Sequence, residues 1–340
     1  MTTDSCAWFD ISEFGVEGKG WTDTKSFYDR FPARAEGVVR EAVWNLSRAP
    51  SGMSVRFETD ATTIRARWKL RSAALGMVHF PATGHSGLDL YARDGAGRWR
   101  WAGAAKQITS QQPENPLIEG ADGTRREFML YLPLFNPVDK VEIGIPKEAS
   151  LTPLAPRKEK AIVFYGTSIV HGGCASRPGM SHPAILGRRL DRPIINLGFS
   201  GNGKMEPEVA GLLAELDPRL YVLDALPNMV EAEVNERAEH FVRTLRAAHP
   251  DTPIVLVEDR TYTDAWIAPA KRKRNDSSRA AYRAAYERLL RSGVRGLHYV
   301  EGETLFGTDD EATMDSSHPS DLGFMRMADA LEPILRKLMP

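Results

Sequence analysis

The fold of the C-terminal half is decided by Ala161-Ile-Val-Phe-Tyr-Gly-Thr-Ser-Ile-Val-His-Gly-Gly173. An apolar run of five residues leads directly into a glycine, a threonine and a serine, as at the point where a buried strand ends and a helix begins. Further short apolar runs occupy 193–196, 220–223, 254–258 and 297–300, and helical stretches separate them. Buried strands that alternate with helices predict a mainly parallel sheet wound with helices.

The first 145 or so residues have a different period. Apolar and polar residues largely alternate in six segments, which predicts half-buried strands at 54–58, 63–69, 87–91, 98–102, 127–132 and 138–144. Turn residues at 94–97 and 113–115 separate some of them, which favours an antiparallel β-sandwich. The stretch 146–160 is rich in proline and charge, as is typical of a linker. We therefore expect a sandwich domain at 1–150 and a second domain at 151–340.

Two separated segments together carry the chemistry of a serine hydrolase. Ser168 follows the first apolar run, and Asp315-Ser-Ser-His318 lies near the C-terminus. A hydroxyl becomes a nucleophile when an imidazole removes its proton and a carboxylate orients that imidazole, so Ser168, His318 and Asp315 form a complete set. Taken alone, the segment around Ser168 is also typical of a helix N-cap, and the segment 315–318 is also typical of a turn that enters a helix. The Gly-x-Ser-x-Gly elbow of α/β-hydrolases is absent, because Val170 stands two residues after the serine.

Two stretches between these segments are suited to an oxyanion hole, which needs N–H donors directed at developing negative charge. Asn196-Leu-Gly-Phe-Ser-Gly-Asn-Gly203 follows the second apolar run, and Leu223-Asp-Ala-Leu-Pro-Asn228 closes the third. Ligands of an open parallel sheet bind beyond the carboxyl ends of its strands. Ser168, Gly201 and Asn228 would all emerge at that edge.

These four blocks, Ser168, Gly201, Asn228 and His318 in that order, resemble those of the SGNH (GDSL-type) hydrolase superfamily over roughly residues 160–338. The resemblance implies a flavodoxin-like α/β/α domain in which Ser168 is the nucleophile of a triad with Asp315 and His318. It also implies an oxyanion hole formed by the N–H groups of Ser168 and Gly201 and the amide of Asn228. Gly87-Leu-Asp-Leu-Tyr91 looks like the signature of the jelly-roll-like, GxDLY-type sandwich that precedes some of these hydrolases.

The chain departs from the family pattern at two places. Thr167 stands where the motif usually has Asp, and Leu226-Pro-Asn-Met229 replaces a common Gly-x-Asn-Asp.

Three further residues are candidates for substrate binding because they follow strands at the predicted active edge. Arg177 would hydrogen-bond a sugar hydroxyl or a carboxylate, or else fix its loop through a salt bridge. Arg260 and Trp266 would wall the pocket, or else pack within their loop.

Composition narrows the class of protein. The 340 residues are 42% hydrophobic and 26% charged, with a formal net charge of −1, so there is no electrostatic case for nucleic acid. The basic run 271–274 is expected to be a solvated loop. Two cysteines are too few for a disulfide framework, and His171 and His182 have no apparent third partner, so we expect neither a metal nor a cofactor. Without a signal sequence or a membrane span, the chain is expected to be cytoplasmic.

The predicted function is therefore a serine esterase that acts on small acyl esters. The resemblance implies O-deacetylation of a carbohydrate, so the expected partner is a small-molecule or saccharide ester. An acyltransferase that uses the same residues is the alternative, and a carbohydrate-binding protein with an inactive hydrolase domain is a second one. We also expect the sandwich to pack near the Ser168 edge and to help form the acceptor pocket. The sequence does not predict the oligomeric state.

Overall fold

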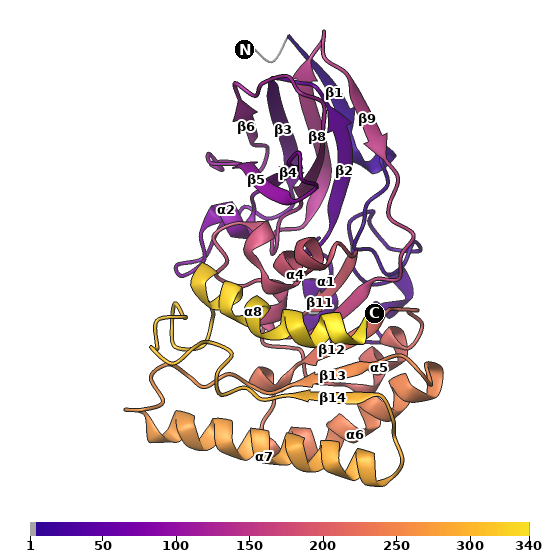
Figure 1. Cartoon of the computed structure of the whole chain (residues 1–340), viewed down its shortest axis with the longest axis vertical. Coiled ribbons are helices and arrows are strands. Elements are labelled where there is room, and N and C mark those ends of the chain that lie inside the picture. The colour runs from indigo at the N-terminus through magenta and orange to yellow at the C-terminus, as the bar shows by residue number, and fades with distance from the viewer. Residues whose placement is uncertain (1–4, 340) are drawn as a thin grey trace.

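The computed structural model describes residues 5–339, in which a β-sandwich is stacked on an α/β unit (Figure 1). The sandwich is built by the N-terminal half of the chain, and the parallel sheet with its helices is built by the C-terminal half. This is the predicted fold class. The predicted division between residues 150 and 151 remains a prediction.

The sandwich consists of two antiparallel sheets, one with the strand order β1-β8-β3-β6 and the other with the order β5-β4-β7-β2-β9. Their apolar faces enclose one core, in which Phe57 and Phe128 stack with ring centroids 5.6 Å apart. The strands are β1 (Cys6–Asp10), β2 (Ser54–Thr59), β3 (Thr63–Leu70), β4 (Asp89–Arg93), β5 (Trp99–Ala104), β6 (Glu114–Glu119), β7 (Arg126–Tyr131), β8 (Val138–Pro146) and β9 (Leu151–Leu154).

All six predicted strands of the sandwich are present, but two local predictions were wrong. The turn expected at 113–115 is the beginning of β6, an edge strand that accommodates Pro116 because one side of an edge strand needs no ladder donors. The expected linker contains β9, which pairs with β2 at the edge of the second sheet. Proline and charge are typical of edge strands as well as of linkers, so the composition alone did not separate the two.

The C-terminal half forms one parallel sheet with the order β11-β10-β12-β13-β14. Each of the five apolar runs is a strand: β10 (Ile162–Gly166), β11 (Ile194–Gly198), β12 (Leu220–Asp224), β13 (Ile254–Val257) and β14 (Leu297–Val300). The chain passes from β10 to β11 on one side and then to β12 on the other. This switch point is where open α/β sheets bind ligands.

Helices cover both faces of the parallel sheet (Figure 1). One face packs against α4 (His182–Leu190) and α8 (Asp321–Leu338), and the other against α5 (Pro207–Leu213), α6 (Glu231–Ala248) and α7 (Pro269–Arg291). The remaining short helices are α1 (Glu41–Ser47), α2 (Ala82–His85) and α3 (Ser168–His171).

Residues 18–50, which we call the N-terminal arm, leave the sandwich and pack against the parallel sheet. Trp21, Phe31 and Trp44 are buried in the same cluster as strand residues of β10 and β11. The fully buried guanidinium of Arg30 donates to the carbonyls of Asn196 and Gly198 at 3.0 and 2.8 Å. The sequence does not predict this arm, because its apolar residues follow neither strand nor helix periodicity.

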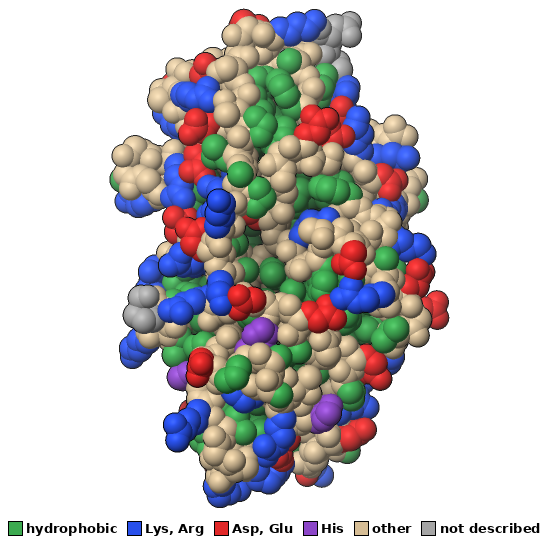
Figure 2. All heavy atoms as spheres, turned by 90° about the vertical axis from the view of Figure 1, so that its right-hand side faces the viewer, with side chains coloured by type: hydrophobic (Ala, Val, Ile, Leu, Met, Phe, Trp, Pro, Cys, Tyr) green, Lys and Arg blue, Asp and Glu red, His purple; other side chains and the backbone are tan. Residues whose placement is uncertain are grey.

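Acidic and basic residues are nearly equal in number, with 45 Asp and Glu against 44 Lys and Arg. Figure 2 shows basic and acidic side chains interspersed on one face, in agreement with the small net charge. The prediction that the basic run 271–274 is a loop was wrong. The run lies in the first turns of α7, where Lys271 pairs with Asp264 and Arg272 pairs with Glu303. Among the helices of residues 5–339, none has the length and apolarity required to cross a bilayer.

Candidate active site

Strand register brings three of the predicted site loops to one edge of the sheet. Gly166, the last residue of β10, is the neighbour of Gly198 in β11 and of Asp224 in β12. Ser168 lies two residues beyond the end of β10, Gly201 three beyond β11 and Asn228 four beyond β12. The three residues therefore follow adjacent strands that end at the same level.

Ser168 opens α3 and is 8% exposed. Thr167 is the N-cap, and its hydroxyl accepts a hydrogen bond from the N–H of Ile169 at 3.2 Å. Where the family pattern usually has Asp, Thr167 thus provides the same kind of cap. The turn is tightly packed, since a Cβ on Gly203 would come within 2.0 Å of the Gly166 carbonyl oxygen. Glycine at that position lets the loop after β11 approach the nucleophile turn.

The loop of residues 312–320 presents His318 to Ser168. Two backbone hydrogen bonds close this loop. The N–H of Ser320 donates to the Ala312 carbonyl at 2.8 Å, and the N–H of Met314 donates to the His318 carbonyl at 2.8 Å. The Ser168 Oγ lies 2.8 Å from His318 Nε2. His318 Nδ1 lies 2.7 Å from Asp315 Oδ2. The predicted serine, histidine and aspartate are therefore connected in a single hydrogen-bonded chain.

Asp315 is held in place by its own loop. Its Oδ1 accepts hydrogen bonds from the N–H groups of Ser317 at 3.1 Å and His318 at 2.8 Å, which form an Asx turn. Partial burial raises the pKa of Asp315, but these bonds and the partner imidazole outweigh it and leave the pKa below its ordinary value. Two other nearby carboxylates have partners of their own, since Asp309 pairs with Arg326 and Asp321 accepts a hydrogen bond from Ser176.

The two other oxyanion candidates lie on loops that arginines hold. Gly201 has a φ of +68°, and a Cβ there would meet no atom within 4 Å. The adjacent Asn202 accepts from Arg40 of the N-terminal arm, with its Oδ1 2.7 Å from Arg40 Nη1. Asn228 ends a short 3₁₀ helix, and Arg274 donates to the carbonyl of the preceding Pro227 at 2.6 Å.

Arg177 fixes the contact between the two halves of the chain. Its Nη1 donates to Asp89 Oδ2 at 2.7 Å and to the Tyr91 hydroxyl at 2.5 Å, both in the GxDLY signature. Asp89 also accepts from the N–H of Gly179 at 2.8 Å and from Trp101 Nε1 at 3.0 Å. Of the two alternatives considered for Arg177, the structure shows the salt bridge that fixes its loop. The Asp and Tyr of the signature thereby hold the loop that follows the nucleophile helix.

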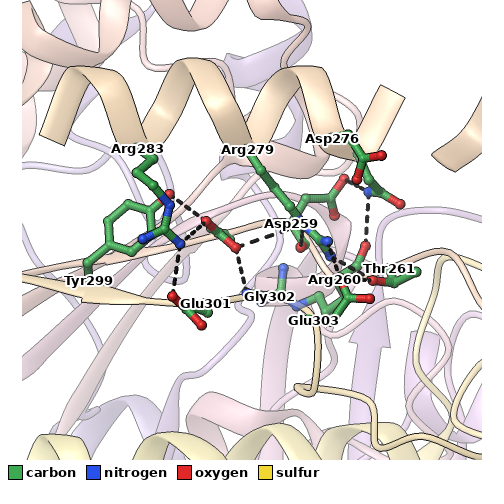
Figure 3. Close-up of polar contacts among 12 residues, drawn as sticks. Asp259, Arg260, Thr261, Asp276, Arg279, Arg283, Tyr299, Glu301, Gly302 and Glu303 are labelled. Atoms are coloured by element: carbon green, nitrogen blue, oxygen red, sulfur yellow. Dashed lines mark hydrogen bonds and ion pairs between the residues drawn. The ribbon is translucent and has the colours of Figure 1, made fainter. Parts of the chain in front are cut away.

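Arg260 does not line an open pocket. Its side chain is 1% exposed and pairs with the fully buried carboxylate of Asp224 at the end of β12. It belongs to a layer of charged side chains, some buried and some partly exposed, at the ends of β13 and β14, to which Arg279 and Arg283 project from α7 (Figure 3). In this layer Glu258 accepts from Arg283 Nη2 at 3.0 Å. We interpret Arg260 as structural and correct the expectation that it contacts substrate.

Trp266 is 76% exposed and helps to line a cavity of about 420 Å³. This cavity adjoins the loop that carries the histidine, because the N–H of Thr263 donates to the Ser316 carbonyl at 3.1 Å. Its walls also include Tyr262 and Phe306, but neither Ser168 nor His318. Trp266 therefore lies beside the nucleophile region rather than in contact with it.

Sequence reasoning missed two residues next to His318. His79 belongs to a turn of the sandwich, and its ring centroid lies 5.8 Å from that of His318. Cys174, which follows α3, has a buried thiol whose pKa is raised to about 12 by burial and by the charge of Asp315. The position of His79 confirms that the sandwich reaches the Ser168 edge. No local pattern marks His79, because only the packing of the two halves brings it there.

Two family models divide the chain between them. Residues 159–336 match the GDSL-like lipase/acylhydrolase family, and residues 6–151 match the N-terminal domain of SGNH-hydrolase-type esterases. The chain belongs to the GDSL-like lipase/acylhydrolase family. No curated protein matches the chain.

Solved structures share the whole arrangement. A GDSL-like lipase from Bacteroides ovatus, described as putative, is 32% identical, with 98% of each chain covered and a TM-score of 0.93. A salicylyl-acyltransferase from a tetracycline biosynthetic pathway is 18% identical over 100% of this chain and 99% of its own, with a TM-score of 0.77. A family two carbohydrate esterase from Cellvibrio japonicus is 15% identical over 98% of each chain, with a TM-score of 0.62. At these low identities, the likeness to the acyltransferase and to the carbohydrate esterase shows only that they share the fold of this chain.

Proposed function

We propose that this family member is a serine esterase, and the observation that carries the proposal is the chain of hydrogen bonds from Ser168 through His318 to Asp315. Ser168 attacks the ester carbonyl while His318 Nε2 accepts its proton, and Asp315 keeps the other imidazole nitrogen protonated. The N–H groups of Ser168 and Gly201 and the amide of Asn228 stabilise the tetrahedral oxyanion. His318 then protonates the leaving alcohol, and water hydrolyses the acyl-enzyme.

The proposed substrate is a small acyl ester of a carbohydrate. Its support is the likeness in fold to carbohydrate esterases, among them an acetyl xylan esterase from Butyrivibrio proteoclasticus with a TM-score of 0.59. The exposed indole of Trp266 beside the active loop offers an apolar face of the kind on which a sugar ring can rest. A cytoplasmic location remains part of this proposal.

An acyltransferase is the second candidate, because the likeness to the salicylyl-acyltransferase extends over the whole chain. The same acyl-enzyme would then pass its acyl group to an alcohol instead of water. Product analysis with competing alcohols separates the two candidates, since an esterase releases the free acid even when acceptors are abundant.

The test of the nucleophile is Ser168→Ala, with Ser292→Ala at the far end of α7 as the matched control. Loss of a triad residue can lower kcat by about 10⁶, so Ser168→Ala should abolish turnover of an activated acetate ester, whereas the control keeps it. A serine-directed organophosphonate should label the wild type at Ser168. Substantial turnover by folded Ser168→Ala would refute the assignment.

The substrate class is tested by a screen of acetylated saccharides against activated esters of increasing acyl length. We expect the highest kcat/KM with acetylated saccharides and a decline as the acyl chain lengthens. Turnover of activated acetate without turnover of any acetylated saccharide would support the esterase and contradict the carbohydrate substrate. Failure to turn over any ester would favour the binding protein.

A further inference from the structure

Three side chains from separate parts of the chain converge at the candidate active site. His79 comes from the sandwich, Cys174 from the turn after α3, and His318 from the loop before α8. One ligating atom from each, two imidazole nitrogens and the thiol sulfur, lies within 4.8 Å of the others. The mechanism proposed above uses only His318 of these three.

The spacing and the chemistry of the three groups fit a borderline or soft divalent cation such as Zn²⁺. Tetrahedral zinc has bonds of about 2.0–2.3 Å to nitrogen and sulfur, which places neighbouring ligand atoms roughly 3.5 Å apart. The three atoms would therefore need to approach by about 1 Å. Calcium and magnesium prefer sets of oxygen ligands, which this cluster does not provide.

The surroundings allow that approach. Cys174 is buried, whereas the side chain of His79 is exposed and is free to adjust. The turn that carries His79 is closed by two hydrogen bonds between Met77 and Phe80, at 2.8 and 3.1 Å, so its backbone is already formed. A metal would enter from the side of His79.

The bond between His318 and Asp315 already has the form found around zinc-bound histidines. A ligating imidazole usually donates its other N–H to a carboxylate, which orients the ring and increases its basicity. Since His318 Nδ1 lies 2.7 Å from Asp315 Oδ2, Nε2 is the nitrogen available to a metal. It is also the nitrogen that lies 2.8 Å from Ser168 Oγ. A metal and the serine proton would compete for one lone pair.

We propose that His79, Cys174 and His318 form a binding site for Zn²⁺ or a cation of similar softness, and that its occupation reversibly inhibits the enzyme. Binding forms bonds from the metal to the two imidazole nitrogens and to the sulfur, whose proton passes to solvent. The His318 lone pair is then unavailable to accept the serine proton. The proposal that the cluster binds zinc depends only on the three side chains. The proposal that zinc inhibits the enzyme also rests on the proposed function.

Binding is tested without reference to activity by calorimetric titration of the metal-free full chain carrying Ser168→Ala with Zn²⁺. We expect one zinc per chain. Adding His79→Ala should weaken binding by about tenfold or more, because even loss of an outer-shell partner costs about 10–100-fold in metal affinity. Cys174→Ser should also weaken it. His240→Ala, which removes an exposed histidine on α6, is the matched control and should have no effect.

Inhibition is tested on chains that retain Ser168, with an activated acetate ester. Zinc should inhibit the wild type and EDTA should restore it, while Mg²⁺ and Ca²⁺ have no effect. Measured against its own zinc-free rate, His79→Ala should require about tenfold or more zinc for the same fractional inhibition. Equal zinc affinity with and without His79 would refute the proposed zinc site. Equal inhibition of wild type and His79→Ala would refute the proposal that zinc bound at this site inhibits the enzyme. A chain without esterase activity would count against the proposed function, and the calorimetry would still decide the site.

Discussion

Asp89 provides the most direct test of how the sandwich and the α/β unit are joined. Its side chain is 0% exposed, and it receives hydrogen bonds from Arg177, Gly179 and Trp101 at 2.7, 2.8 and 3.0 Å. Burial raises the pKa of Asp89, and the nearby Arg177 opposes that rise. Asp89→Ala would leave a largely buried guanidinium and a buried N–H of Gly179 without this acceptor.

The expected cost follows from that geometry. Removal of one partner from a buried ion pair lowers the free energy of unfolding by about 3–5 kcal/mol, because the remaining charge stays desolvated. We therefore expect Asp89→Ala to lose about 3–5 kcal/mol in urea unfolding followed by tryptophan fluorescence. Asp122→Ala is the matched control, since it removes a carboxylate that pairs with Arg126 on the exposed surface of the same sandwich. Exposed pairs contribute little, so the control should unfold almost as the wild type does.

A second measurement separates a local from a general effect. Arg177 and Gly179 lie on the loop that follows the nucleophile helix, so Asp89→Ala should also lower kcat/KM on an activated ester under native conditions. If Asp89→Ala were as stable as Asp122→Ala, the buried contact would not join the two units, and our reading of the GxDLY signature would be wrong.

Three further outcomes follow from the site. His318→Ala should lower kcat by about 10⁶ and Asp315→Asn by about 10⁴, since the acid of a triad contributes less; equal losses in steady-state assays would contradict this order. Asn228→Ala should lower kcat by about 10²–10³ with little change in KM, unlike Asn235→Ala on α6. Asp259 is the buried residue before Arg260, and burial raises its pKa from 3.8 to about 6. The folded state therefore keeps a proton that the unfolded chain loses, so the free energy of unfolding should fall as pH rises from about 4 to about 6, and Asp259→Asn should reduce this slope.

The features predicted from sequence are those that local patterns determine. Each of the five apolar runs is long enough for one buried strand and is bounded by turn residues, so the parallel sheet was predicted strand by strand. Asp315 and His318 are three residues apart, and their Asx turn depends only on nearby backbone, so their pairing was also expected.

The features that the sequence did not predict depend on contacts between distant segments. Arg260 follows a strand at the active edge, as a pocket residue would, yet it meets the buried Asp224 of a neighbouring strand. Arg177 is next to the nucleophile loop in sequence, but its partners lie 88 and 86 residues away in the sandwich. His79 lies beside His318 because of the same contact between the two halves. Such pairings follow from tertiary packing between distant segments. A single sequence predicts local structure from its periodicity, but it does not indicate which distant residues come into contact.

The N-terminal arm suggests why the sandwich and the hydrolase unit occur on one chain. Arg30 donates to the carbonyls of Asn196 and Gly198, and Arg40 donates to Asn202, so two arginines of the arm hold the backbone on either side of Gly201. An oxyanion donor contributes to catalysis only when it is fixed before charge develops. The loop after β11 is rich in glycine and would be mobile without these contacts. The N-terminal half therefore supplies part of the rigidity that the proposed oxyanion hole needs.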